Sequence, residues 1–405
     1  MNVAIVSIGD ELMNGFTVDT NSSWMAKNLQ QYESIKIISK ITVSDNTIDI
    51  KASIDSLIKK KINYIFVTGG LGPTHDDITK KALSEYFGTN IVLNESYYKR
   101  LKIFFKNKEN FHLKSQAEIL ENSSPIPNRY GTALGMLIKY KESNIFVLPG
   151  VPKEVKGMFK REVFPSYFDP IFSKEKKYVT LLTTGIYESK LFEILENTIN
   201  SNLNLFKLSF LPKHTGVKVR LSKKRKNANL EKFKKQVLGK IKKYTYGIDD
   251  QKIEEIVATQ LINKSLTVAV AESCTGGLIS KKMTDVAGSS IYFKGSIIAY
   301  DNSIKKKFLN ISEDLLENKG AVSEEVCIKM AEKVKEKFCT DIGISTTGIS
   351  GPDGGTSDKP VGLIYIAIIA KNIKIVKKFN LIPHRKKHRE VSAHIALNML
   401  RLVIK

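Results

Sequence analysis

The chain has 405 residues, of which 42% are hydrophobic and 26% are charged, and its formal net charge is +23. These proportions are typical of a globular protein, and the length favours two or three domains rather than one core. No apolar stretch approaches the roughly 20 residues that span a membrane, and no basic leader precedes residues 3–8, so we expect no membrane association. The cysteines Cys274, Cys327 and Cys339 lack paired spacing, which argues against disulfides or a zinc site and favours a reducing cytoplasm.

Most of the positive charge comes from lysine, because eight of the 64 basic residues are Arg and the other 56 are Lys. Proteins that read bases or clamp phosphates rely on the planar guanidinium of arginine. The lysines are also spread along the chain. We therefore interpret the charge as a compositional bias and consider nucleic-acid binding unlikely, although the field would attract small anionic substrates.

Strand-like and helix-like segments alternate in the first part of the chain. The expected strands cover residues 3–8, 35–43, 64–68 and 145–148. The expected helices cover residues 20–30, 48–60 and 76–87, and another begins at residue 152. This alternation predicts a parallel sheet with helices on both faces. Ligands bind at the carboxyl ends of the strands in such folds.

Two more segments follow. Residues 171–247 predict a small, loop-rich α+β module with strands at 178–183 and 217–221 and helices at 188–200 and 230–244. From residue 251, strands are expected at 266–271, 296–300, 342–347, 362–369 and 373–379, and helices at 253–263, 277–284, 323–338 and 390–402. The fold class is therefore α/β with three domains, at residues 1–170, 171–247 and 248–405.

Three polar, glycine-rich clusters lie at the ends of expected strands in the first segment. Their glycines can turn backbone N–H groups toward a phosphate, aided by the positive end of a helix starting at Asp76. The candidate phosphate-binding residues are Gly69, Gly70, Gly72, Thr74 and Gly150. The carboxylates that could hold a Mg²⁺-like cation are Asp10, Glu11, Asp76 and Asp77, with Asp19 close by in the sequence. Alternatively, Asp76 and Asp77 only suit a helix N-terminus.

The segment AESCTGG, residues 271–277, lies between a buried strand and a helix. A serine at such a turn is surrounded by N–H groups that can stabilise an oxyanion, which makes Ser273 a candidate nucleophile. The alternative is that Ser273 and Thr275 only cap the helix. Thr346 begins a second cluster, a glycine-dense loop over residues 346–356 that is suited to wrapping a phosphate or a ribose.

A nucleophilic serine needs a base. The histidines His384, His388 and His394 lie in a basic tail without a signature spacing. Lys305 is the better candidate, because a lysine in the first turn of a helix capped by Asp301 or Asn302 has its pKa lowered by the helix dipole. A solvent-facing Lys305 is the alternative.

The first segment resembles the molybdopterin-binding fold shared by molybdenum-cofactor enzymes and CinA proteins. The resemblance rests on GDEL from Gly9 with the following DTN, on TGGLGPT.DD.T from Thr68, and on LPGVPKE from Leu148. In the CinA branch it implies a pyrophosphatase that acts on ADP-ribose and depends on a divalent metal. The GTAPG stretch of the family is here Gly131-Thr132-Ala133-Leu134-Gly135, without its proline.

The middle segment is similar to the KH-like module of CinA proteins, through TTGIYESKLFEIL from Thr183 and LSFLPKHTGVKVRL from Leu208. A functional KH domain clamps nucleotides with a GXXG loop, which residues 171–247 lack. We therefore expect a spacer or dimer-forming module, and the resemblance implies a homodimer.

The third segment resembles the C-terminal domain of CinA, a nicotinamide mononucleotide deamidase. The resemblance implies hydrolysis of the carboxamide to nicotinate mononucleotide and ammonia without a cofactor, with Ser273 as nucleophile, Lys305 as general base and Tyr300 assisting it. Substrate binding is assigned to Thr275, Gly276, Thr347, Gly348, Gly351, Gly354, Gly355, Arg385 and Arg389. The phenylalanine-x-glycine-aspartate-arginine stretch of the family is replaced by residues 381–385, although Arg385 and Arg389 keep the spacing. Cys274 is a competing nucleophile on chemistry alone, but a lone cysteine beside a packed helix is more often structural.

Two alternatives stay open. In the first, only the N-terminal domain is active, on molybdopterin or another nucleotide diphosphate. In the second, the chain is a non-enzymatic accessory protein of competence that binds nucleic acid.

Overall fold

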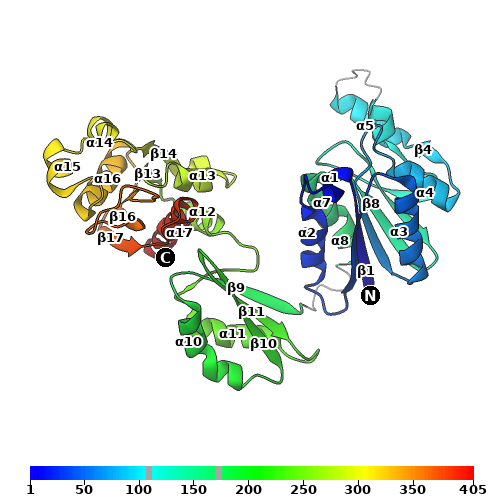
Figure 1. Ribbon diagram of the computed structural model, residues 1–405, viewed down its shortest axis with the longest axis horizontal. Coiled ribbons are helices and arrows are strands. Elements are labelled where there is room, and N and C mark those ends of the chain that lie inside the picture. Colours follow the sequence, from blue (N-terminus) through cyan, green and yellow to red (C-terminus); the bar gives the residue numbers. More distant parts are fainter. Residues whose placement is uncertain (106–111, 169–175) are drawn as a thin grey trace. The chain divides into compact units, whose positions relative to one another are not determined.

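The computed structural model describes residues 1–105, 112–168 and 176–405. The chain forms two compact units, Met1–Lys177 and Tyr178–Lys405. The first unit is one α/β domain, drawn from blue to cyan-green in Figure 1. The second unit contains a small sheet with two helices, in green, and a second α/β domain, in yellow to red. The α/β fold in three domains is thereby confirmed.

A six-stranded sheet forms the centre of the first unit, in the order β2-β1-β3-β8-β7-β6. The first four strands in this order are parallel, as predicted, whereas β7 and β6 are antiparallel and extend one edge. Strand bounds are Asn2–Ile8 (β1), Lys36–Val43 (β2), Tyr64–Thr68 (β3), Ser123–Ile126 (β6), Gly135–Tyr140 (β7) and Ser143–Leu148 (β8). Because β1, β3 and β8 are parallel, the turns that follow them meet at one edge of the sheet.

Helices cover both faces of this sheet, as predicted. Successive residues of β1 point to opposite faces, so Val6 and Ile8 enter one core and Val3 and Ile5 enter the other. The first core is covered by α3 (Thr47–Lys59), α4 (Thr79–Phe87) and α5 (Glu95–Phe104). The second is covered by α2 (Thr20–Leu29), α7 (Pro152–Met158), a π-helical turn (Phe159–Val163) and α8 (Phe164–Tyr167). Smaller elements are α1 (Asp10–Met13), α6 (His112–Gln116) and the pair β4 (Ile91–Leu93) and β5 (Glu118–Leu120).

The middle segment is more regular than expected. Four antiparallel strands run in the order β10-β11-β9-β12, with bounds Tyr178–Thr183 (β9), Phe206–Lys213 (β10), Gly216–Lys223 (β11) and Thr245–Ile248 (β12). Helices α10 (Glu188–Asn200) and α11 (Leu230–Ile241) share one core with the sheet. The prediction of a loop-rich module is therefore wrong. The exposed edge strand β10 has a weak alternation of apolar and polar residues, which hid it.

The C-terminal domain has a five-stranded sheet in the order β14-β13-β15-β16-β17. Strand β13 pairs in parallel with β14 and β15, and β16 and β17 complete the sheet in antiparallel fashion. The strand bounds are Val268–Glu272 (β13), Phe293–Ile298 (β14), Ile342–Gly348 (β15), Leu363–Ala370 (β16) and Ile373–Asn380 (β17). The loops after β13 and β15 therefore leave neighbouring strands at the same edge.

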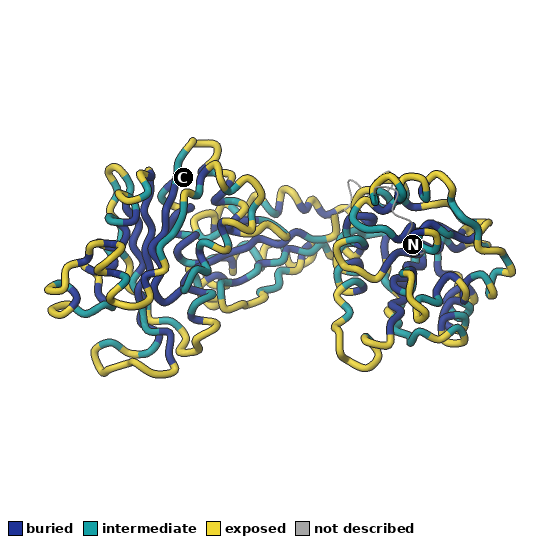
Figure 2. Tube along the Cα trace, turned by 90° about the horizontal axis from the view of Figure 1, so that it is seen from above, coloured by how far each residue is buried: buried dark blue, intermediate teal, exposed yellow. Residues whose placement is uncertain are grey.

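Two layers of helices enclose this second sheet. One layer consists of α12 (Ile253–Asn263), α13 (Leu278–Thr284) and α17 (Arg385–Val403), and the other of α14 (Asn302–Leu309), α15 (Glu313–Lys319) and α16 (Glu324–Lys337). A short 3-10 turn covers Ser289–Ile291. In Figure 2 the buried segments lie along the sheets of each unit, and exposed residues concentrate in the outer loops. Within the described residues, none of the helices combines the length and the apolar character that crossing a membrane requires.

Candidate functional site

A cavity of about 520 Å³ lies at the carboxyl ends of β1, β3 and β8 in the first unit. Of the predicted phosphate-binding residues, Gly69, Gly70, Gly72 and Gly150 line it. Glycine is required at Gly69, where φ is +108° and a Cβ would lie 2.2 Å from the carbonyl oxygen of Ile8. The same holds at Gly70, where a Cβ would lie 2.1 Å from Thr79 Oγ1. Glycine at these two positions therefore lets the backbone turn tightly against its neighbours, as a phosphate-binding turn requires.

The helix expected from Asp76 begins three residues later, at Thr79. The carboxylate of Asp77 instead accepts hydrogen bonds from the backbone N–H of Gly72 (2.7 Å), from that of Thr74 (2.9 Å) and from Thr74 Oγ1 (2.5 Å). A local bond from an aspartate to nearby N–H groups competes with helix formation, which explains the late start. The predicted helix start at Asp76 is therefore wrong, and Asp77 holds the loop that precedes α4.

Glu11, Asp45, Asp76 and Asp77 line the cavity, and Asp10 lies next to them without lining it. The N–H of Asp10 donates to Asp45 Oδ2 (2.9 Å), and the N–H of Asp45 donates to Asp10 Oδ1 (3.1 Å). Burial raises the pKa of Asp45, and the negative charges of Asp10, Glu11 and Asp76 raise it further. Asp45 follows β2 and was not predicted, because Ser44-Asp45-Asn46 has the composition of an ordinary helix cap. Among the described residues, no three acidic, histidine or cysteine side chains converge closely enough to hold a metal by themselves.

The DTN motif supports the cavity rather than lining it. Asp19 caps α2 by accepting from the N–H of Ser22 (2.9 Å) and also accepts from Ser7 Oγ (2.8 Å). Burial acts to raise the pKa of Asp19, but these hydrogen bonds and the charge of Lys40 outweigh it and lower the pKa. Asn21 Nδ2 donates to the carbonyl oxygen of Gly150 (2.6 Å), which ties α2 to the turn after β8.

Glu154 is the second unpredicted residue of the cavity. It belongs to the first turn of α7, is half-buried, and accepts from Asn128 Nδ2 at 2.6 Å. Burial raises its pKa, against the effect of that hydrogen bond. In the sequence it looked like an ordinary acidic residue of a helix N-terminus. A carboxyl group with a raised pKa inside a polar cavity is a candidate for proton transfer.

The AESCTGG segment of the second unit is held by a buried carboxylate. Glu272 ends β13, is fully buried, and accepts from the N–H of Ile279 (3.1 Å), the N–H of Ser280 (2.9 Å) and Ser280 Oγ (2.6 Å). It therefore satisfies the first free N–H groups of α13. The alternative prediction had assigned this capping role to Ser273 and Thr275. Neither of those two side chains caps α13, whose N-cap is Gly277 in the left-handed conformation.

Ser273 lies between the ends of two neighbouring strands. Its N–H donates to the carbonyl oxygen of Thr346 (3.0 Å) on β15, and the N–H of Ala299 donates to the carbonyl oxygen of Glu272 (2.8 Å) beside it. Thr275 Oγ1 bonds Thr346 Oγ1 at 2.8 Å inside the protein. Within the described bonds, the N–H groups of Thr275 and Gly277 donate to no protein acceptor. The turn thus offers unpaired donors to an anion.

Lys305 is buried and belongs to α14, which Asp301 caps as predicted. Its Nζ donates to the carbonyl oxygen of Tyr300 (3.0 Å) and to Asn302 Oδ1 (3.3 Å). Burial lowers the pKa of Lys305, although the charge of Asp301 acts in the opposite direction. The solvent-facing alternative is therefore wrong.

Residues 384–389 belong to the start of α17, with His384 at its N-cap. The prediction that they form a basic tail before a helix starting at residue 390 is therefore wrong. Lysine and arginine are unfavourable at a helix N-terminus, so the sequence pattern pointed to a later start. His388 and His394, expected in that tail, are buried. His388 Nδ1 bonds Ser350 Oγ at 2.9 Å and so joins α17 to the glycine-dense loop.

Both predicted arginines reach the loops of the site. Arg389 Nε and Nη2 donate to the carbonyl oxygen of Thr275 (3.3 and 2.9 Å), and a Cβ at Gly276 would lie 3.1 Å from Nη2. Arg385 Nη1 donates to the carbonyl oxygen of Gly351 (3.0 Å), and its Nη2 donates to Tyr300 Oη (3.0 Å). Two guanidinium groups, the turn after β13 and the glycine-dense loop thus lie together.

The glycine-dense loop connects β15 to β16. Thr347 is buried and its Oγ1 donates to the carbonyl oxygen of Ala321 (2.7 Å), so its hydroxyl supports the loop. A Cβ at Gly348 would lie 2.6 Å from the carbonyl oxygen of Leu363. Gly351 is buried, whereas Gly354 and Gly355 are exposed.

Cys274 does not compete with Ser273 as a nucleophile. It is buried, and burial raises the pKa of its thiol to about 12. The thiolate is the reactive form of cysteine, and such a thiol stays protonated at neutral pH. Cys274 packs in the core shared with α12, α13 and α17, so its role is structural.

Comparisons with known proteins agree along the whole chain. Residues 4–168 match the probable molybdopterin binding domain, residues 179–247 the KH domain of damage-inducible protein CinA, and residues 250–404 the CinA C-terminal domain. CinA-like proteins of Dictyoglomus thermophilum and Kosmotoga olearia are 37% and 36% identical, over 99% of this chain and 98% of each relative. The crystal structure of competence/damage inducible protein CihA from Agrobacterium tumefaciens matches 38% of this chain and 96% of its own, with 32% identity and a TM-score of 0.36. The chain therefore belongs to the CinA family.

Proposed function

We propose that the C-terminal domain hydrolyses the carboxamide of nicotinamide mononucleotide, giving nicotinate mononucleotide and ammonia. The observation that carries the proposal is the buried Lys305, whose amine contacts a carbonyl and an amide oxygen instead of a carboxylate. A neutral amine has two N–H donors and one lone pair. If both donors are engaged by Tyr300 and Asn302, the lone pair is left to accept a proton.

Ser273 is the nucleophile in this proposal. As its Oγ bonds to the carboxamide carbon, its proton passes to Lys305 Nζ, and the carbonyl oxygen becomes an oxyanion near the free N–H groups of Thr275 and Gly277. Collapse of this intermediate breaks the C–N bond, and Lys305 returns the proton to the departing ammonia. Water then attacks the serine ester by the same route, which releases the carboxylate and restores Ser273.

The phosphate of the substrate is assigned to the guanidinium groups of Arg385 and Arg389, one turn apart on α17. Both already bond carbonyl oxygens of the site loops, which orients their planar groups before a ligand binds. A guanidinium matches a phosphate through paired N–H donors. Gly354 and Gly355 of the glycine-dense loop are exposed and have no side chains, so their backbone is accessible to the substrate.

The test is ammonia release from nicotinamide mononucleotide by the full chain and by Ser273→Ala. Removing the nucleophile is expected to lower kcat by at least about 10³-fold. Ser290→Ala, which alters an exposed serine outside the site, is the matched control and should keep full activity. Full activity of Ser273→Ala would show that the nucleophile is assigned wrongly.

For the N-terminal domain we propose a pyrophosphatase that acts on ADP-ribose and depends on a divalent cation. One or two carboxylates of the group Asp10, Glu11, Asp45 and Asp76, whose negative charges act on Asp45, would hold the cation together with phosphate oxygens of the substrate. When bound, a Mg²⁺-like ion neutralises diphosphate charge, and such ions commonly use only one or two carboxylates together with substrate phosphates. Asp77 is not among the ligands, because its carboxylate is engaged by Gly72 and Thr74. Glu154 can hold a proton beside the diphosphate, since burial raises its pKa.

This second proposal is tested by ADP-ribose hydrolysis in Glu154→Gln. Loss of the titrating group should lower kcat by about 10²-fold, the lower limit for a positioned acid or base. Glu142→Gln, at an exposed turn outside the cavity, should leave kcat unchanged. A variant Glu154→Gln with the original kcat and pH profile would remove Glu154 from the reaction.

A further inference from the structure

A buried histidine lies between the two arginines that are assigned to the substrate phosphate. His388 is fully buried and belongs to α17, three residues after Arg385 and one residue before Arg389. None of the steps proposed above uses its imidazole. Its hydrogen bonds indicate which part of the site it supports.

These hydrogen bonds fix which ring nitrogen of His388 carries the proton. Nε2 lies 3.2 Å from the carbonyl oxygen of Gly362, and because a carbonyl oxygen only accepts, Nε2 is the donor. Burial lowers the pKa of His388, although the bond to Gly362 acts in the opposite direction, so the ring is neutral at neutral pH. Nδ1 therefore keeps its lone pair, and it accepts the hydrogen bond from Ser350 Oγ at 2.9 Å.

One imidazole thus joins the two ends of the connection between β15 and β16, which contains the glycine-dense loop. Ser350 follows β15 and Gly362 precedes β16, and both are buried, whereas residues 352–358 between them are exposed. The N–H of Gly362 also donates to the carbonyl oxygen of Ile349 (2.8 Å). Glycine is required at Gly362, where φ is +104° and a Cβ would lie 2.3 Å from the carbonyl oxygen of Leu381. The base of the loop is therefore fixed to α17, while its outer part faces solvent.

The base of the loop in turn orients Arg385. Its Nη1 donates to the carbonyl oxygen of Gly351 (3.0 Å), the residue next to Ser350. The direction of this carbonyl depends on where the Ser350–His388 bond holds the chain. Arg389 lies on the same face of α17, since residues four apart are neighbours on a helix surface. Two guanidinium groups bind one phosphate well only when their spacing matches it, so a shift of the loop base would weaken phosphate binding.

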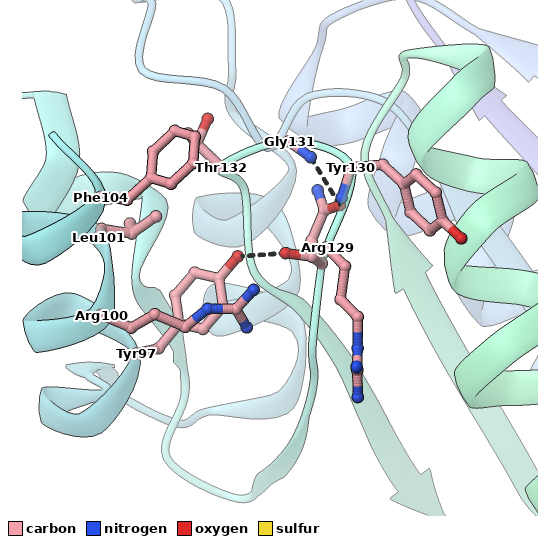
Figure 3. Close-up of a pocket in the computed structure, with 9 residues that line it drawn as sticks. Tyr97, Arg100, Leu101, Phe104, Arg129, Tyr130, Gly131 and Thr132 are labelled. Carbon is pink, nitrogen blue, oxygen red and sulfur yellow. Dashed lines mark hydrogen bonds between the residues drawn. The ribbon is translucent and has the colours of Figure 1, made fainter.

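The first unit supports a loop of its cavity in the same way. Asn128 is buried, and its Oδ1 accepts from the N–H groups of Tyr130 and Gly131, both at 3.0 Å, which fixes the loop that Figure 3 shows. Its Nδ2 donates to Glu154 of α7. In both units, one buried polar side chain connects a loop of the site to a neighbouring helix, as a preorganised site requires.

We propose that the Ser350–His388 pair positions the phosphate-binding end of the deamidase site and thereby sets the preference for a phosphorylated nucleoside over the same nucleoside without phosphate. The inference rests on the deamidase proposed above. Both are positioning residues, because they hold the Gly351 carbonyl that Arg385 contacts. Loss of the pair weakens the binding of the phosphate and leaves the chemistry at the carboxamide unchanged.

The experiment compares ammonia release from nicotinamide mononucleotide and from nicotinamide riboside, which lacks the phosphate. In the full chain, Ser350→Ala should raise KM for the mononucleotide about tenfold, in the range for a lost buried hydrogen bond, and should keep kcat. The kcat/KM for the riboside should not change, because this substrate makes no phosphate contact. An equal loss with both substrates, or a lower kcat with the original KM, would overturn the proposal.

Two substitutions of His388 separate its two hydrogen bonds. In His388→Asn the side-chain oxygen takes the place of Nδ1 and can still accept from Ser350, so KM for the mononucleotide should stay close to the original value. In His388→Gln an amide N–H can still reach Gly362 but the acceptor for Ser350 is lost, so KM should rise about tenfold. The same KM in both variants would show that the bond to Ser350 does not position the loop.

Ser392→Ala is the matched control for a buried hydrogen bond of α17. Ser392 is buried one turn after His388, and its Oγ donates to the carbonyl oxygen of His388 (2.6 Å) within the helix. This variant should keep KM for the mononucleotide and the preference for it over the riboside. A rise in KM equal to that of Ser350→Ala would mean that any weakening of α17 has this effect, which would also overturn the proposal.

Equilibrium binding of nicotinamide mononucleotide, measured by titration calorimetry in parallel, separates this inference from the deamidase. Binding that Ser350→Ala weakens about tenfold, without ammonia release by any form, would remove the proposed reaction and keep the positioning role. Ammonia release with the same KM in the original chain and in Ser350→Ala would keep the reaction and overturn the positioning role. The absence of binding at millimolar mononucleotide would overturn it as well.

Discussion

At the scale of single residues, the C-terminal site depends on a lysine amine taken out of water. Lys305 is 2% exposed, and its burial opposes the protonated form. The sequence indicated the same direction from the position of Lys305 in the first turn of a helix. The structure adds desolvation by burial, which lowers the pKa of Lys305. Glu154 in the N-terminal cavity shows the same effect with the opposite sign, because burial favours the neutral carboxyl group.

We expect deamidase activity to rise with pH until Lys305 has lost its proton. Because burial lowers the pKa of Lys305, the rising limb should lie below the pH range of an ordinary lysine. The measurement is kcat/KM for nicotinamide mononucleotide against pH. Lys305→Gln should lose activity by at least about 10³-fold, whereas Lys306→Ala, at the exposed neighbouring position, should keep both rate and profile. An unchanged profile in Lys305→Gln would refute the role of Lys305 as base.

Cysteine reagents are expected to spare the activity. Cys274 and Cys327 are buried with pKa values of about 12, and Cys339 is exposed. Alkylation of the native chain should therefore label Cys339 alone, as mass spectrometry of peptides would show, with deamidase activity retained. Labelling of Cys274 with parallel loss of activity would contradict the structural role assigned to it.

At the scale of secondary-structure elements, both sites are made where parallel strands end. Glu272 on β13 and Asp77 after β3 each hold the turn that follows by accepting backbone N–H groups. Asp77 was predicted as a metal ligand from the sequence and Glu272 was assigned no role, and both accept backbone hydrogen bonds in the structure. The early start of α17 at Arg385 brings side chains to the site instead. Arg385 and Arg389, which were expected in a basic tail, lie on the first turns of α17 and donate to carbonyl oxygens of the site loops.

Asp76 and Asp77 are adjacent and should respond differently to the same change. Asp76→Asn removes a charge from the acidic cluster, so the metal concentration for half-maximal ADP-ribose hydrolysis should rise about tenfold. Asp77→Asn weakens the hydrogen bonds that the Asp77 carboxylate accepts from the N–H groups of Gly72 and Thr74. It should therefore lower the free energy of unfolding by about 1–3 kcal/mol, without a comparable shift in metal dependence. Metal titrations and thermal melts of both variants distinguish the roles. Equal metal shifts in the two variants would return Asp77 to the metal ligands.

At the scale of the whole molecule, two compact units each contain their own candidate site. The acidic cluster lies in the first unit and the Ser273 turn in the second. The middle module is an ordered sheet with two helices, and residues 171–247 have no GXXG loop, which favours a structural role over nucleic-acid binding. The homodimer and the cytoplasmic location stay predictions.

Chelation is expected to separate the two activities in one preparation. The N-terminal reaction is proposed to need a divalent cation and the Ser273–Lys305 reaction is not, so EDTA should abolish ADP-ribose hydrolysis and leave ammonia release from nicotinamide mononucleotide unchanged. Both rates are measured on the same full-length sample before and after chelation, with Mg²⁺ added back. Loss of both activities would refute the metal-free mechanism.

The sequence alone determined many of the elements and which residues gather at strand ends, because periodicity, glycines and motifs such as AESCTGG are local; it did not determine β10 or the starts of α4 and α17. The four parallel strands of the first sheet and the cap of α14 were predictable for this reason. Only the tertiary structure decided which polar groups face a ligand and which hold the backbone. Asp77 became a loop anchor, Asp45 and Glu154 entered the cavity, and Lys305 became buried, because burial and hydrogen-bond partners depend on segments far apart in the chain.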